Sequence, residues 1–200
     1  MNNTLTKTAQ RQNTSSPELV KYGILSCALI PLYTLLFASK GGLLASNLSK
    51  TGNLPGNQIW FILWGVVCAG YFHIFSTRVY EFAGFKSKVT KPMMSAACAL
   101  LTLTVLFPFL PDQYPICAQL HDTSAKLAVA LSVFTTLIFS LDLKHVNPAA
   151  SGKAVALWVW HFVLCLYLLL RTGTSGLTES MFIITTSIQL FVIMHWACEE

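Results

Sequence analysis

Three histidines within long apolar segments are the residues of this sequence best placed to do chemistry. His73, His161 and His195 each lie where an ionisable side chain is costly and needs a reason. Imidazole groups can relay protons or bind a haem or a metal ion. None of the three has the close spacing to another that is typical of a metal site. We therefore predict separately hydrogen-bonded histidines of the inner leaflet, with no cofactor and no metal ligand. A haem or a metal at His73, His161 and His195 is the alternative.

Two further polar side chains accompany these histidines inside the apolar segments. Ser76 lies one helical turn after His73, on a face that also carries small residues, and Gln189 lies in the last apolar segment before His195. Small residues let a neighbouring helix approach closely, so the face with Ser76 is predicted to be a packing seam. The alternative is a polar pocket lined by His73 and Ser76.

A second set of polar residues lies at the ends of apolar segments and in the first loop, on the side that we assign below to the outside. An acidic residue at the start of a helix is favoured by the helix dipole, and ion pairs at a surface need no function. The same residues could also gather into an outward-facing polar site for a lipid headgroup or a partner membrane protein, which is our hypothesis. The residues of this predicted site are His121, Asp122, Glu179, Arg171, Ser46 and Asn47.

A hydrolytic enzyme would need a nucleophile within reach of a base. Ser76 with His73, or Cys117 with His121, could supply such a pair, but neither lies in a recognisable motif. The sequence leaves enzymatic activity undecided.

The composition requires a membrane around these residues. Of the 200 residues, 54% are hydrophobic and only 10% are charged, whereas soluble domains carry roughly 25% charged residues. The net charge of +5 includes no basic run with interleaved aromatic residues, so nucleic acid is not an expected partner. Six cysteines, mostly within apolar segments, form no disulfide framework.

The hydropathy pattern predicts an all-α integral membrane protein with a bundle of six transmembrane helices. Residues 1–16 are a polar, flexible tail, and residues 17–198 form the transmembrane domain. Each apolar stretch has the length needed to cross about 30 Å of hydrocarbon, and Gly- and Pro-rich breaks separate them. The predicted spans are 20–39, 58–82, 91–110, 122–142, 153–171 and 177–197.

Lysine and arginine predict the orientation of these spans. With the N-terminus inside, nine of these residues fall on inner segments and four on outer ones. Inner segments of membrane proteins carry the excess of such residues, so both termini are predicted to be cytoplasmic. The chain is expected to be a multi-pass protein of a bacterial inner membrane or of a eukaryotic plasma membrane or endomembrane.

Three short features resemble the DRAM/FRAG/SFK-like family of six-helix membrane proteins and its bacterial relatives of unknown function. They are the first loop (Ser46-Asn47-Leu48-Ser49, then Gly52-Asn53 and Pro55), Phe107-Pro108, and His121 after a short Pro-rich loop. The acidic residue often found after the loop-one serine is absent here. The resemblance implies a lipid-associated protein whose shared elements face the outer side.

We therefore expect a lipid-associated membrane protein whose outer polar site recognises a lipid headgroup or a partner membrane protein. Membrane lipids, another membrane protein or a second copy of the chain are the expected partners. One alternative is a membrane enzyme or redox protein that uses the intramembrane histidines. Another is a small transporter or channel. No acidic residue lies in the middle of any predicted span, which argues against transport of protons or cations.

Overall fold

The structure is a computed structural model that describes residues 19–83 and 88–198, apart from the side chains of Phe82 and Cys198. Within these ranges all regular secondary structure is helical. The predicted N-terminal tail, 1–16, lies outside the described residues. The prediction of an α-helical membrane bundle agrees with this architecture.

Six long helical segments and two short ones make up the described chain. Five of the long segments are long and apolar enough to cross a membrane, whereas α5, with 17 residues, is shorter. The first long segment runs from Leu19 to Ser39 and includes one π-helical turn, η1. The elements are η1 (Leu25–Leu29), α2 (Ile30–Ser39), α3 (Leu48–Gly52), α4 (Gln58–Phe82), α5 (Thr90–Leu106), α6 (Pro115–Asp142), η2 (Leu143–His145), α7 (Pro148–Thr172) and α8 (Gly176–Cys198).

Prolines account for most differences between the predicted and the observed boundaries. The helices α6 and α7 begin at Pro115 and Pro148, several residues before the predicted starts, because proline suits the first turn of a helix. The side chain of Asn147 also caps α7 by accepting a hydrogen bond from the next turn. By contrast, α5 ends at Leu106 rather than at 110, because Pro108 disfavours a helical conformation for the residue before it.

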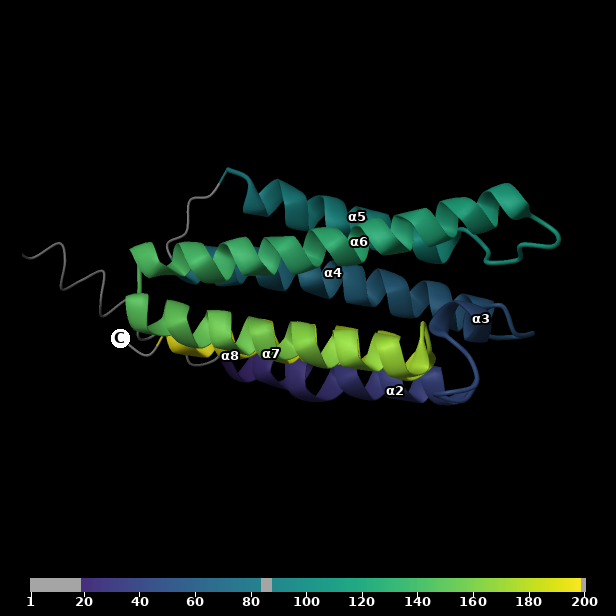
Figure 1. Ribbon diagram of the computed structural model, residues 1–200, viewed down its shortest axis with the longest axis horizontal. Coiled ribbons are helices and arrows are strands. Elements are labelled where there is room, and N and C mark those ends of the chain that lie inside the picture. The colour runs from purple at the N-terminus through teal and green to yellow at the C-terminus, as the bar shows by residue number, and fades with distance from the viewer. Residues whose placement is uncertain (1–18, 84–87, 199–200) are drawn as a thin grey trace, which may run out of the picture.

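The long helices lie side by side, and α3 covers one end of the bundle (Figure 1). In this view α4, α5 and α6 form one half, and α2, α7 and α8 form the other. The start of the first long segment, Leu19–Ser39, and the end of α8 lie toward the end opposite to α3 (Figure 1). A hydrogen bond of 2.9 Å from Ser187 Oγ to the carbonyl of Ser26 joins the last helix to the first.

Aromatic side chains fill the core between the first helix, α4 and α8. Phe61 stacks on Trp64 with ring centroids 5.9 Å apart, and Phe37 stacks on both rings. The indole of Trp64 donates a hydrogen bond of 3.0 Å to Thr34. Such a donor must find a partner inside the bundle, because hydrocarbon offers none.

The helices differ in how much of their surface the bundle covers. In the most apolar stretch, half of the residues are buried in α4 and in α8, but only 11% in α7. Most of α7 therefore faces outward, with large apolar side chains such as Val163 and Leu170 exposed. In a membrane this surface would contact lipid.

Candidate functional site

His121 is the centre of a polar cluster at the α3 end of the bundle. Its Nε2 lies 2.7 Å from the hydroxyl of Ser49, and its Nδ1 lies 2.9 Å from the carbonyl oxygen of Phe107. A carbonyl can only accept, so Nδ1 carries the proton and donates it, and a neutral ring accepts from Ser49 at Nε2. The ring is 2% exposed and lies between Phe61 and Phe109.

Because α5 ends early, the carbonyl of Phe107 is free to accept a hydrogen bond from His121. The last four carbonyls of a helix have no partner within the helix. Phe107 follows the last residue of α5 in an extended conformation, which Pro108 favours, and its carbonyl is available to a side chain from α6. The same connection also contacts the first loop, since the Asn53 amide donates to Phe109 O at 3.2 Å.

Glu179 holds α3 from the other side. Its carboxylate accepts a hydrogen bond of 2.7 Å from the backbone N–H of Leu48, although 131 residues separate the two in sequence. Asn47 caps the same short helix by accepting from Lys50 N at 2.7 Å. The carbonyl of Ser46 accepts from Gly176 N at 2.6 Å, which joins the loop to the start of α8.

Four of the six residues of the predicted outer site therefore meet around α3. We call this arrangement the α3 cap, and its residues are Ser46, Asn47, Ser49, His121 and Glu179. Ser49 was not among the predicted site residues, because its partner lies 72 residues away and no spacing rule connects them. The only signal for it was its place in the loop motif Ser46-Asn47-Leu48-Ser49.

The remaining two residues, Asp122 and Arg171, have no contact with the α3 cap among the interactions of the described residues, and their grouping with His121 and Glu179 stays a prediction. Asp122 forms an exposed ion pair of 2.5 Å with Lys126, one turn along α6. Adjacent residues of a helix point about 100° apart, so Asp122 faces outward where His121 faces inward. Arg171 is exposed at the end of α7, while Glu179 turns toward α3.

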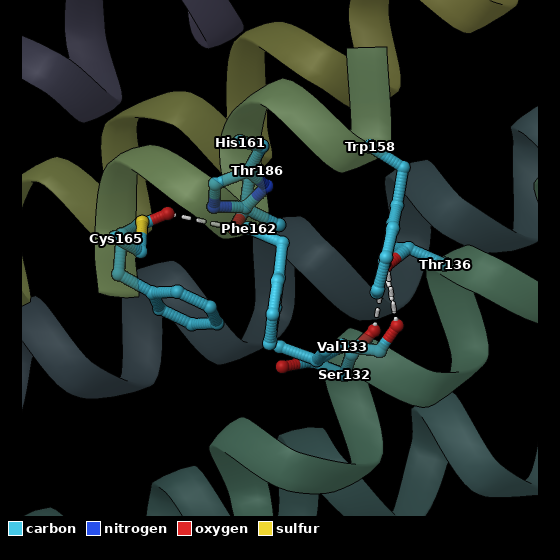
Figure 2. Close-up of a pocket in the computed structure, with 9 residues that line it drawn as sticks. Ser132, Val133, Thr136, Trp158, His161, Phe162, Cys165 and Thr186 are labelled. Atoms are coloured by element: carbon cyan, nitrogen blue, oxygen red, sulfur yellow. Dashed lines mark hydrogen bonds between the residues drawn. The ribbon is translucent and has the colours of Figure 1, made fainter. Parts of the chain in front are cut away.

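His161 belongs to a separate recess halfway along the bundle (Figure 2). It lies thirteen residues after the start of α7, about 20 Å along the helix, and so nearer the middle than the predicted start of this span implied. The recess is open on one side, and its enclosed part has room for about one water-sized group. It is lined by Ser132, Val133, Thr136, Trp158, His161, Phe162, Cys165, Phe182 and Thr186.

The imidazole of His161 is only partly satisfied. Nδ1 lies 2.7 Å from the side-chain oxygen of Gln189 on α8, so the two predicted intramembrane residues do meet. Within the described chain, Nε2 of His161 and the amide nitrogen of Gln189 are buried without a hydrogen-bond partner. Leaving such groups unpaired costs free energy, most of all where no water can reach them.

His73, His161 and His195 do not gather into one site. His73 is exposed on α4, with Nδ1 3.4 Å from the hydroxyl of Ser95 on α5. Ser76 is buried, but its hydroxyl donates to the backbone carbonyl of His73 rather than to the ring, so they form no nucleophile–base pair. His195 is exposed near the end of α8.

The described residues also contain no group of three His, Cys, Asp or Glu side chains that could hold a metal ion. The geometry leaves two places for further argument, which are the α3 cap and the recess at His161. Comparisons with models of protein families, with curated proteins and with solved structures found no match to this chain.

Proposed function

We propose that this protein crosses the membrane six times with both ends in the cytoplasm, and that the surface of its α3 cap binds the headgroup of an anionic lipid. Five helices are long enough to span a bilayer, and the 17 residues of α5 reach the lower limit of that range. The N-terminal end of the first long helical segment and the C-terminal end of α8 lie on the same side of the bundle (Figure 1). This arrangement supports an even number of crossings. The excess of lysine and arginine on the inner segments supports the orientation.

The observation that carries the proposal is the division of α3 into a fixed inner side and a free outer side. Glu179 and His121 hold the inner side through partly buried hydrogen bonds, whereas Lys50 on the same helix is exposed. A cation on a backbone that is held from several directions loses little freedom when it binds an anion. Lys50 is therefore the residue that we expect to contact a lipid phosphate.

Neighbouring groups at the same end suit the surface of a membrane. Lys40 lies with its ammonium 5.3 Å from the centre of the exposed Trp60 ring, and tryptophan is enriched at the level of lipid headgroups. Arg171 adds an exposed cation. The opposing groups at this end are the exposed Asp112 and the carboxyl group of Glu179. The exposed Asp122 is already paired with Lys126. The local excess of positive charge favours an anionic headgroup.

The lipid proposal is tested by replacing Lys50 in purified protein. Nanodiscs that contain equal amounts of phosphatidylglycerol and phosphatidylcholine supply both headgroups, and the lipids retained after detergent extraction are counted by mass spectrometry. Lys50→Gln should lower the retained phosphatidylglycerol several-fold. Lys144→Gln, an exposed lysine next to the opposite end of the bundle, is the matched control. Equal retention in all three proteins would rule out lipid binding at the cap.

The orientation is tested separately in intact cells. Lys50→Cys, in a chain that also carries Cys117→Ser, should react with a membrane-impermeant maleimide, because the α3 end is assigned to the outside. Lys144→Cys in the same background should react only after the cells are opened. The reverse pattern would overturn the assigned orientation and leave the lipid result to be judged on its own.

A further inference from the structure

We propose that the recess between α6, α7 and α8 binds the hydroxyl group of a neutral lipid alcohol, with Nε2 of His161 as the acceptor. The recess is distinct from the α3 cap, and the inference does not depend on the function proposed for the cap. It rests on the partners of His161, on the lining of the recess and on the access from lipid.

The orientation of the imidazole defines what the recess can bind. Gln189 presents its oxygen to Nδ1, so Nδ1 carries the hydrogen and Nε2 holds a lone pair. The side chain is 6% exposed, and Nε2 has no partner among the described residues. A bound molecule must therefore offer a hydrogen to Nε2, as a hydroxyl does.

The other polar groups around the recess already have partners. The indole N–H of Trp158 donates to Val133 O at 3.1 Å across the gap between α7 and α6, as Figure 2 shows. The hydroxyl of Ser132 donates to the carbonyl of Val129 at 2.9 Å, and that of Thr186 donates to the carbonyl of Phe182 at 2.6 Å. The hydroxyl of Thr136 donates in the same way within α6.

One buried acceptor without a partner, in a lining whose hydroxyls are already bonded to helix carbonyls, suits one hydroxyl on an apolar body. The rings of Trp158, Phe162 and Phe182 supply apolar and aromatic surface on two helices. The site lies midway along α7, where an ionised group would be costly in a membrane. A charged phospholipid headgroup is therefore excluded, and a neutral alcohol is favoured.

The ligand can enter from the bilayer. Phe162 lines the recess and is 43% exposed, on the helix that has the least buried surface of the candidate spans. The enclosed part of the recess has room for a group of about the size of a hydroxyl. The apolar chain of the alcohol would lie along the exposed apolar surface of α7, in contact with lipid.

The test uses the full chain in detergent micelles, with radiolabelled 1-hexadecanol as the probe. Unlabelled 1-hexadecanol should displace the label, whereas 1-methoxyhexadecane, which lacks the hydroxyl hydrogen, should not. His161→Phe removes the acceptor and should weaken binding about fivefold or more, the equivalent of one lost hydrogen bond. His73→Phe, a histidine outside the recess, is the matched control and should bind as the unaltered protein does.

Any of three results would overturn the proposal. Displacement by the methyl ether as effective as by the alcohol would show that the hydroxyl is not recognised. Unchanged binding to His161→Phe would show that the label is held elsewhere. If His161→Phe does not fold, binding of the label is measured with Cys165→Phe instead. This substitution fills the recess and leaves the hydrogen bond between His161 and Gln189 in place. Unchanged binding to that variant would also refute the inference.

Discussion

The hydrogen bond between Ser49 and His121 should contribute measurably to stability, because it ties the first loop to α6. Replacement of Ser49 by alanine leaves Nε2 of His121 buried without a partner, since the ring is 2% exposed. Such a loss costs about 1–3 kcal/mol. Replacement of His121 by alanine removes both of its hydrogen bonds and leaves a cavity between two phenylalanine rings, so about 3–5 kcal/mol is expected.

A double-mutant cycle separates the bond itself from these side effects. Once His121 is absent, Ser49→Ala no longer leaves a buried nitrogen without a partner. The double variant should therefore lose less unfolding free energy than the two single variants together, by about 1 kcal/mol or more. The free energy of unfolding is measured in mixed micelles by titration with a denaturing detergent, with tryptophan fluorescence as the signal. Losses that add to within about 0.3 kcal/mol would refute the bond as an energetic link.

Three further predictions concern other contacts. A Cβ at Gly65 would lie 2.2 Å from a methyl carbon of Val105, so Gly65→Ala should destabilise the bundle by about 1–3 kcal/mol, and Val105→Ala in the same chain should restore part of the loss in the same unfolding assay. Glu179→Ala should make the first loop more sensitive to protease, because it leaves a backbone N–H of α3 without its acceptor, whereas Glu179→Gln keeps an acceptor and should protect the loop; equal cleavage of the two variants would contradict this. Asp122→Asn breaks only an exposed ion pair with Lys126, and a change in stability above about 1 kcal/mol would contradict that role.

Hydropathy alone located most of the helices. The predicted span 58–82 and the helix α4 cover the same residues, because Gly and Pro punctuate the chain before it and the apolar run is unbroken. The short α3 was missed because five residues give no periodicity, and its start depends on one capping side chain, Asn47. The Asn147-Pro148 pair was interpreted as a break, although the same two residues also form a good helix start.

The site was predicted less completely than the helices. That polar residues at one end would gather could be expected, since hydrocarbon forces them together or toward the surface. The sequence could not show which of these residues would meet, because the side chain of His121 and that of Glu179 bond to residues 72 and 131 positions away. One side of the recess could be expected from the sequence, since Ser132 and Thr136 are spaced to share a face of α6. The residues that α8 contributes could not, because only the folded chain brings this helix near.

The hydrogen bond from Ser187 to Ser26 also has a consequence for the making of the protein. The two residues are 161 positions apart, so the first helix is synthesised long before its partner. In that interval the carbonyl of Ser26 has no Ser187 to bind, and the groove that α8 later fills stays open to lipid. Final assembly therefore has to wait until α8 has been synthesised, and a nascent chain that stalls before α8 should be a good substrate for membrane quality-control proteases.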